Sequence, residues 1–142
     1  MQVLHRACSS VAVWLVLFKR VAKLFYGHGE IVDMVRRPPA LVGNIHAFAL
    51  YVTGDSMVPW KRRGQLLYID PNRPARTGDY VVVECHGEDG EAGAAYLKLL
   101  VAQTPTQIRL AQHNPPDDRI ALPLKRVKRI FRVLELEELM GV

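Results

Sequence analysis

The feature that most constrains this chain is a series of short strand-like runs between residues 45 and 136. Each run is rich in β-branched, aromatic or leucine residues and ends near a turn that contains glycine, proline or asparagine. The runs are HAFALYVT, QLLYID, DYVVVEC, AYLKLL, QIRLA, IALPL and VKRIFRVLEL. No segment between Ile45 and Pro123 has a helical repeat of apolar residues. The sequence therefore predicts a mainly β domain of bent, partly closed antiparallel sheets.

The N-terminal segment has a different pattern. Its apolar run VAVWLVLF, Val11 to Phe18, is closed by Lys19 and Arg20. This run is far shorter than the roughly 20 apolar residues of a membrane-spanning helix. At helical spacing the apolar residues form one stripe: Val11, Trp14, Leu15, Phe18, Ala22 and Phe25. We expect a short amphipathic helix that packs on the domain, pairs with a second copy or lies at a membrane surface.

The stretch RRPPALVGN, residues 36–44, marks the predicted domain boundary. Its paired prolines, Pro38 and Pro39, fix the backbone and oppose helix formation, so the stretch reads as an extended connector. We therefore expect an N-terminal helix and linker over residues 1–37 and the β domain over residues 38–142.

Charge and cysteine content narrow the class of protein. The chain of 142 residues has a net charge of +5, and residues 1–44 hold six basic residues against two acidic ones. Attraction to nucleic acid or an anionic membrane would therefore centre on that segment, unless it is simply a solvated basic face. Cys8 and Cys85 lie far apart and outside any metal-binding spacing. We expect no cofactor and no metal, and a reducing, cytoplasmic location.

The stretch YVTGDSMVPW places Ser56 just after a strand-like run. A serine hydroxyl is a weak nucleophile until a neighbouring base takes its proton. Histidine is the usual base, but the chain's five histidines lie outside hydrolase motifs, and GDSMV is not the GxSxG pattern. A Ser-His-Asp triad is therefore not indicated.

Lysine is the other base that serine chemistry accepts. It must be neutral to act, which requires an apolar environment that disfavours the ammonium form. Of the six lysines, Lys98 lies among leucines in AYLKLL, whereas the others lie in polar or basic stretches. Strand alternation also allows Lys98 to point to solvent, so the pattern alone leaves both interpretations open.

Five motifs occur in a characteristic order: VTGDSMVP, GQLLYIDPNRPARTGDYVVVE, YLKLL, LAQHNP and VKRIFRVLEL. Together they resemble the peptidase-like domain shared by LexA, UmuD and phage repressors of the CI type, over about residues 38–136. The resemblance implies a curled β domain that dimerises and cuts its own upstream linker with a Ser-Lys dyad. It implies Ser56 as nucleophile, Lys98 as general base, and the backbone N–H groups of Asp55 and Ser56 as oxyanion donors.

Other residues near these motifs are predicted to be structural. Met57 is expected to pack in the core, and Asp55 is expected to be a turn residue. Asn114 and Pro115 are expected to form a turn before the edge strand.

The chain departs from the family pattern in two features. The first 44 residues, with one plausible helix, are too few for the helix-turn-helix module of the DNA-binding members, so no direct DNA-binding domain is expected here. Self-cleaving members are cut at an upstream Ala-Gly or Cys-Gly bond. Here Ala92-Gly93 lies downstream of the serine, and the residues before the upstream glycines are Tyr26, His28, Val42 and Thr53. Self-cleavage and retention of the fold as a dimerisation or sensing module both remain open.

Two further functions and several partners stay under consideration. A signal peptidase has a similar Ser-Lys architecture, and a pure interaction protein would keep the dyad as a relic. The resemblance implies a second copy, a full-length repressor or a RecA-type co-protease as partner. A membrane partner is not expected, because the apolar run Val11 to Phe18 is short. The closing run has one mostly apolar face, Val127, Arg129, Phe131 and Val133, which either pairs across a two-fold axis or closes its own sheet.

Overall fold

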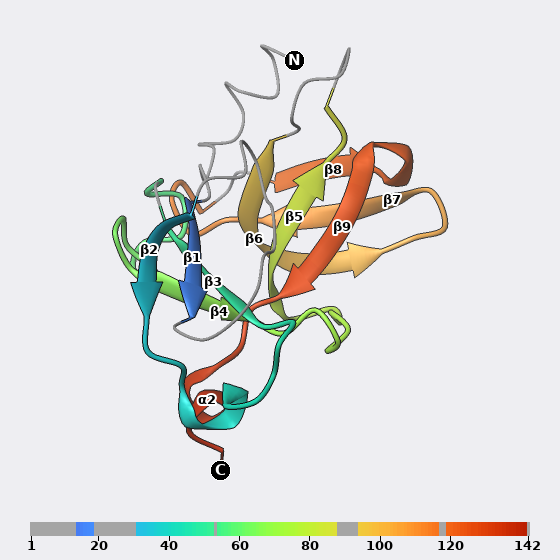
Figure 1. Cartoon of the computed structure of the whole chain (residues 1–142). Coiled ribbons are helices and arrows are strands. Elements are labelled where there is room, and N and C mark those ends of the chain that lie inside the picture. The colour runs from blue at the N-terminus through green and yellow to red at the C-terminus, as the bar shows by residue number, and fades with distance from the viewer. Residues whose placement is uncertain (1–13, 19–30, 53, 88–93, 117–118, 142) are drawn as a thin grey trace.

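The computed structural model describes residues 14–18, 31–52, 54–87, 94–116 and 119–141. Within these residues the chain forms two β-sheets with little helix (Figure 1). The predicted mainly β fold is confirmed. The strand-like runs that begin at residue 45 each contain an observed strand, and the described residues between Ile45 and Pro123 contain no helix.

The first sheet has four strands in the order β2-β1-β3-β4. Pairing of β3 with both β1 and β4 is antiparallel, whereas β1 and β2 are parallel, which is an exception to the predicted antiparallel arrangement. The strands are β1 (Trp14–Phe18), β2 (Ile31–Val35), β3 (Phe48–Tyr51) and β4 (Leu66–Ile69).

The second sheet has five antiparallel strands in the order β8-β7-β6-β5-β9. Figure 1 shows β7 and β8 crossing the direction of β5 and β9 steeply, so this sheet is strongly curled. The strands are β5 (Tyr80–Cys85), β6 (Ala95–Gln103), β7 (Gln107–Ala111), β8 (Arg119–Pro123) and β9 (Val127–Arg132). β9 pairs with β5, so the closing run does complete its own sheet. Pairing with a second copy stays a prediction.

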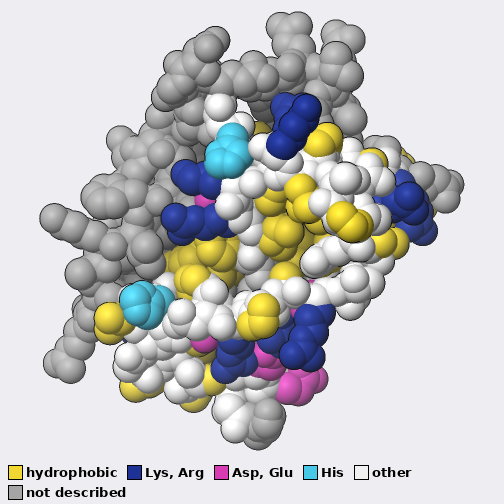
Figure 2. Space-filling view, turned by 90° about the vertical axis from the view of Figure 1, so that its right-hand side faces the viewer, with side chains coloured by type: hydrophobic (Ala, Val, Ile, Leu, Met, Phe, Trp, Pro, Cys, Tyr) yellow, Lys and Arg dark blue, Asp and Glu magenta, His cyan; other side chains and the backbone are white. Residues whose placement is uncertain are grey.

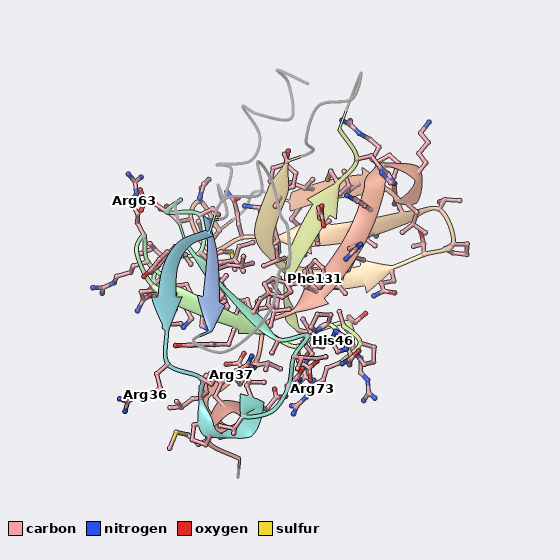
Figure 3. All side chains as sticks on the ribbon, in the orientation of Figure 1. Arg36, Arg37, His46, Arg63, Arg73 and Phe131 are labelled. Atoms are coloured by element: carbon pink, nitrogen blue, oxygen red, sulfur yellow. The ribbon has the colours of Figure 1, made fainter. Side chains whose placement is uncertain are left out.

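The main core lies between the two sheets. Phe48 on β3 meets Phe131 on β9 edge to face, with ring centroids 5.4 Å apart, and Figure 3 shows Phe131 near the middle of the molecule. Val82 and Leu97 join the same buried cluster, and an isolated bridge from Ile69 to Val133 links the sheets. Each such side chain stabilises the fold by roughly 1.5–3 kcal/mol through burial.

Strand β6 is buried on both faces, which decides the environment of its lysine. Leu97 packs in the cluster between the sheets, whereas Tyr96 and Leu100 pack in a second cluster on the opposite face of the strand. Because side chains alternate along a strand, Lys98 lies on the same face as Tyr96 and Leu100. This second cluster is closed by residues of β5, β7 and β8.

The predicted N-terminal helix is wrong over Trp14–Phe18, which forms strand β1. Its residues include valine, tryptophan and phenylalanine, which suit strands, and β1 hydrogen-bonds to the edge that β3 would otherwise leave open. Tertiary pairing therefore overrides the helical spacing of the apolar residues. Residues 1–13 and 19–30 of the predicted helix and linker lie outside the described residues. The domain boundary after residue 37 stays a prediction.

One short helix near the C-terminus was not predicted. The closing run leaves strand geometry after Arg132, and α2 spans Leu136–Met140. A capping box between Glu135 and Glu138 begins the helix, and Gly141 ends it with a φ of 79°. Two 3-10 turns, η1 (Pro39–Leu41) and η2 (Leu124–Arg126), complete the elements. Among the described residues, no helix has the length and apolar character needed to span a membrane.

Candidate active site

Ser56 lies in a tight turn that follows β3. The Val58 N–H donates to the Asp55 carbonyl at 3.2 Å, and the Lys61 N–H donates to the Met57 carbonyl at 2.9 Å. Met57 is only 1% exposed and belongs to the core between the sheets, so it anchors the turn. The predictions of core packing for Met57 and a turn at Asp55 are confirmed. Ser56 itself is 2% exposed.

Lys98 is completely buried on β6, with 0% exposure. Its cross-strand partner is Val81, and its neighbours on the same strand face are Tyr96 and Leu100. The alternative in which Lys98 points to solvent is therefore wrong. Alternation fails as a guide to exposure here because both faces of β6 are covered.

The structure brings the predicted serine and lysine together. Lys98 Nζ lies 2.9 Å from Ser56 Oγ, although 42 positions separate the residues in the sequence. This distance is within the range over which a proton moves directly between two heavy atoms. The two atoms therefore have the geometry of a nucleophile and its base.

A third polar side chain, Gln112, contacts the lysine and was missed by the sequence reasoning. Lys98 Nζ lies 3.0 Å from Gln112 Oε1, and Gln112 is 5% exposed. The contact follows from the hairpin register: Leu99 pairs with Ala111, so the next position, Gln112, falls beside Lys98. That register could not be read from the sequence because a bulge interrupts the β6–β7 pairing between Leu100 and Ala102.

The segment after β7 also holds the backbone of the serine turn. The N–H groups of His113 and Asn114 both donate to the Ser56 carbonyl at 2.9 Å. The Asn114 side-chain amide donates to the Asp55 carbonyl at 3.2 Å. These contacts agree with the structural role predicted for Asn114. The bonds before Pro59 and Pro115 are both cis.

An aromatic cluster supports this segment from the other side. The Tyr80 hydroxyl lies 2.7 Å from His113 Nε2, and the Tyr80 ring stacks on Trp60 with centroids 3.5 Å apart. Burial, and then the negative charge of Glu135, raises the pKa of Tyr80 above its usual value. Tyr80 therefore stays a neutral phenol at ordinary pH and can donate to the histidine.

The predicted oxyanion donors lie at the start of the same turn. Among the described residues, the backbone N–H groups of Asp55 and Ser56 donate no hydrogen bond within the protein. Their role stays a prediction.

The charged groups around the site are on the surface. Asp55 pairs with Arg63 at 3.1 Å, and both side chains are more than half exposed. Figure 2 shows Lys and Arg side chains in several separate groups on one face, with hydrophobic side chains between them. The basic residues Arg6, Lys19, Arg20 and Lys23 lie outside the described residues. Within the described ranges, His, Cys, Asp and Glu side chains form no group of three that could bind a metal.

Comparison with known proteins agrees with this architecture. Residues 22–133 match the family described as Peptidase S24-like. The chain belongs to this family. The resemblance to LexA, UmuD and CI-type repressors is therefore confirmed at the level of the domain.

A curated relative of this S24-like chain is a phage protein. Repressor protein C of Rhizobium phage 16-3 is 36% identical over 91 residues. The match covers 62% of this chain and 35% of the relative, so the chain corresponds to about a third of that protein. No solved structure matches the chain.

Proposed function

We propose that this S24-like domain is a serine endopeptidase in which Ser56 is the nucleophile and Lys98 the general base. The observation that carries the proposal is the 2.9 Å contact between Lys98 Nζ and Ser56 Oγ, with both residues almost completely buried. Complete burial disfavours the ammonium form of a lysine, which supports a role for the neutral amine.

The reaction follows from these positions. Neutral Lys98 takes the Ser56 hydroxyl proton while Oγ attacks the carbonyl carbon of the scissile peptide bond. The carbonyl oxygen becomes an oxyanion, which the N–H groups of Asp55 and Ser56 stabilise. Collapse of this intermediate breaks the C–N bond, and the Lys98 ammonium gives its proton to the leaving amine. Water, deprotonated by the same lysine, then hydrolyses the acyl-enzyme.

We place this activity in regulation by proteolysis, as in SOS or prophage control of transcription. The similarity to a phage repressor supports that context. The substrate is a segment of the same chain or of a partner repressor, and the domain acts as a homodimer. Residues 1–55 contain no Ala-Gly or Cys-Gly bond, so a cut within them would fall at another bond.

The test is the intact mass of the purified protein after incubation across pH 7–10, beside Ser56→Ala and Lys98→Ala variants. A serine-directed phosphonofluoridate is added to parallel samples. We expect adduct formation on the wild type alone, faster at higher pH as the neutral amine is populated. Fragments that appear in the wild type alone would locate the bond. An unlabelled and uncut wild type would overturn the peptidase proposal and favour a silent dimerisation module.

A further inference from the structure

Gln112 touches the proposed base directly, and no motif assigns it a role. We propose that Gln112 is a positioning residue that orients the Lys98 amine toward Ser56 without placing a negative charge beside it. This inference rests on the proposed function. It follows from the identity, orientation and anchoring of the Gln112 side-chain amide.

The orientation of that amide is fixed at its other end. Gln112 Nε2 donates to the Asn114 carbonyl at 3.1 Å. A carbonyl oxygen accepts hydrogen bonds and cannot donate them, so the nitrogen of the amide must face Asn114. The oxygen, Oε1, must therefore face Lys98, and it accepts a hydrogen bond from Nζ at 3.0 Å.

A fixed acceptor at this position restrains rotation of the amine. A neutral amine has two N–H bonds and one lone pair. When one N–H points at Gln112 Oε1, rotation about the Cε–Nζ bond is restricted, and the lone pair can be directed at Ser56 Oγ, 2.9 Å away. Such orientation of a reacting group contributes to the rate because misdirected rotamers do not react.

The acceptor is also uncharged, which matters for the protonation of the base. An amide oxygen supports the ammonium ion formed during the reaction through a single hydrogen bond. A carboxylate at the same place would form a buried ion pair and hold Lys98 permanently charged. Glutamine therefore keeps an acceptor at Nζ without the negative charge that would disable the base.

The same segment positions both members of the dyad. The backbone N–H groups of His113 and Asn114 donate to the Ser56 carbonyl, while the side-chain oxygen of Gln112 accepts from Lys98. The titratable groups next to these contacts are occupied elsewhere: His113 bonds to Tyr80, and Asp55 pairs with Arg63 at the surface.

The experiment compares Gln112→Glu and Gln112→Met with the wild type. A matched control is Gln103→Glu. It introduces the same charge at an exposed position of β6, the strand that carries Lys98. Gln103 lies five residues along β6 from Lys98, which corresponds to roughly 16 Å. Two quantities are measured in each protein: the pH dependence of phosphonofluoridate labelling, and the titration of Lys98 followed through its ¹³Cε NMR signal. The same spectra report whether each variant is folded.

We expect Gln112→Glu to move the Lys98 titration upward by at least about one pH unit and to slow labelling near pH 7 by about tenfold. Gln112→Met should move the titration downward, because the ammonium loses an acceptor. It should also lower the labelling rate at the high-pH plateau, because the amine loses its orientation. Gln103→Glu should match the wild type in both measurements.

The two proposals fail in different ways. If Ser56 is labelled in the wild type but the Gln112 variants titrate and react as Gln103→Glu does, the positioning role is wrong and the peptidase proposal stands. If the wild type is not labelled, the peptidase proposal is wrong. In that case opposite shifts of the Lys98 titration in the two Gln112 variants still support the contact, and unchanged titrations overturn it.

Discussion

Two clusters of polar side chains in this molecule differ in their exposure to solvent and in the charge of the groups that they bring together. The site cluster, Ser56, Lys98 and Gln112, is at most 5% exposed. The C-terminal cluster, Glu138 with Arg73 and Arg132, joins α2 to the loop after β4 and to β9, and its side chains are 21–37% exposed. Glu138 is bound by both arginines, at 2.7 Å from Arg73 and by a close contact with Arg132.

The difference shows what each environment permits. In the partly exposed cluster, opposite charges stay ionised, and solvent limits the stability that each ion pair contributes. In the buried cluster, the lysine contacts a hydroxyl and an amide, both of which are uncharged. The first arrangement holds a helix against the sheets, and the second is the kind of environment that the proposed mechanism requires for a neutral amine.

The largest expected effect comes from removing the buried amine. Lys98→Met should reduce labelling or cleavage by at least about 10⁴-fold, since a base and its nucleophile act as a unit. The folded state should persist because methionine fills the space of the lysine stem without a group that needs solvation. Labelling kinetics and thermal unfolding of the same sample check both statements. A variant that reacts at the wild-type rate would remove Lys98 from the proposed mechanism.

A smaller effect is expected at the core anchor of the serine turn. Met57→Ala should lower the free energy of unfolding by about 2–5 kcal/mol, because Met57 is 1% exposed and its loss leaves a cavity. Urea denaturation measures this change. Met140→Ala is the matched control, since Met140 is 56% exposed and its truncation should change stability by less than about 0.5 kcal/mol. Equal losses in the two variants would contradict the assignment of Met57 to the core.

The smallest effect is expected in the C-terminal cluster. Burial tends to raise the pKa of Glu138, but hydrogen bonds from the Glu135 N–H, Arg132 and Arg73 together lower it below the usual value. The ionised carboxylate therefore stabilises the fold above the unfolded-state pKa of glutamate, and this contribution is lost as pH falls through the lower folded-state pKa. Glu138→Gln should cost about 1 kcal/mol or less at pH 7.

The pH dependence of that loss gives the control. The stability difference between Glu138→Gln and the wild type should shrink as the pH is lowered through the folded-state pKa, and added salt should reduce it at pH 7. Activity at Ser56 should not change, because the substitution lies outside the site cluster. Denaturation curves that differ by the same amount at every pH would show that the loss has another cause.

Much of the site was predictable because its chemistry depends on residue types in a recognisable order. Ser56 follows a glycine turn, Lys98 lies among leucines, and both fall in motifs that resemble S24-like domains. Gln112 was not predictable, because its contact depends on a β6–β7 register that a bulge shifts. The strand Trp14–Phe18 was mistaken for part of a helix because its apolar spacing fits both structures, and only pairing with β3 favours the strand.

The sequence by itself determined the strands from β3 onward and the two residues that carry the proposed chemistry, because local propensity and motif order are properties of the chain alone. Only the tertiary structure decided that β6 is covered on both faces, so that Lys98 is buried and not solvated. It also decided that Ser56 and Gln112 both contact the amine of Lys98. Burial and contact between such segments depend on how the sheets pack, which no single segment encodes.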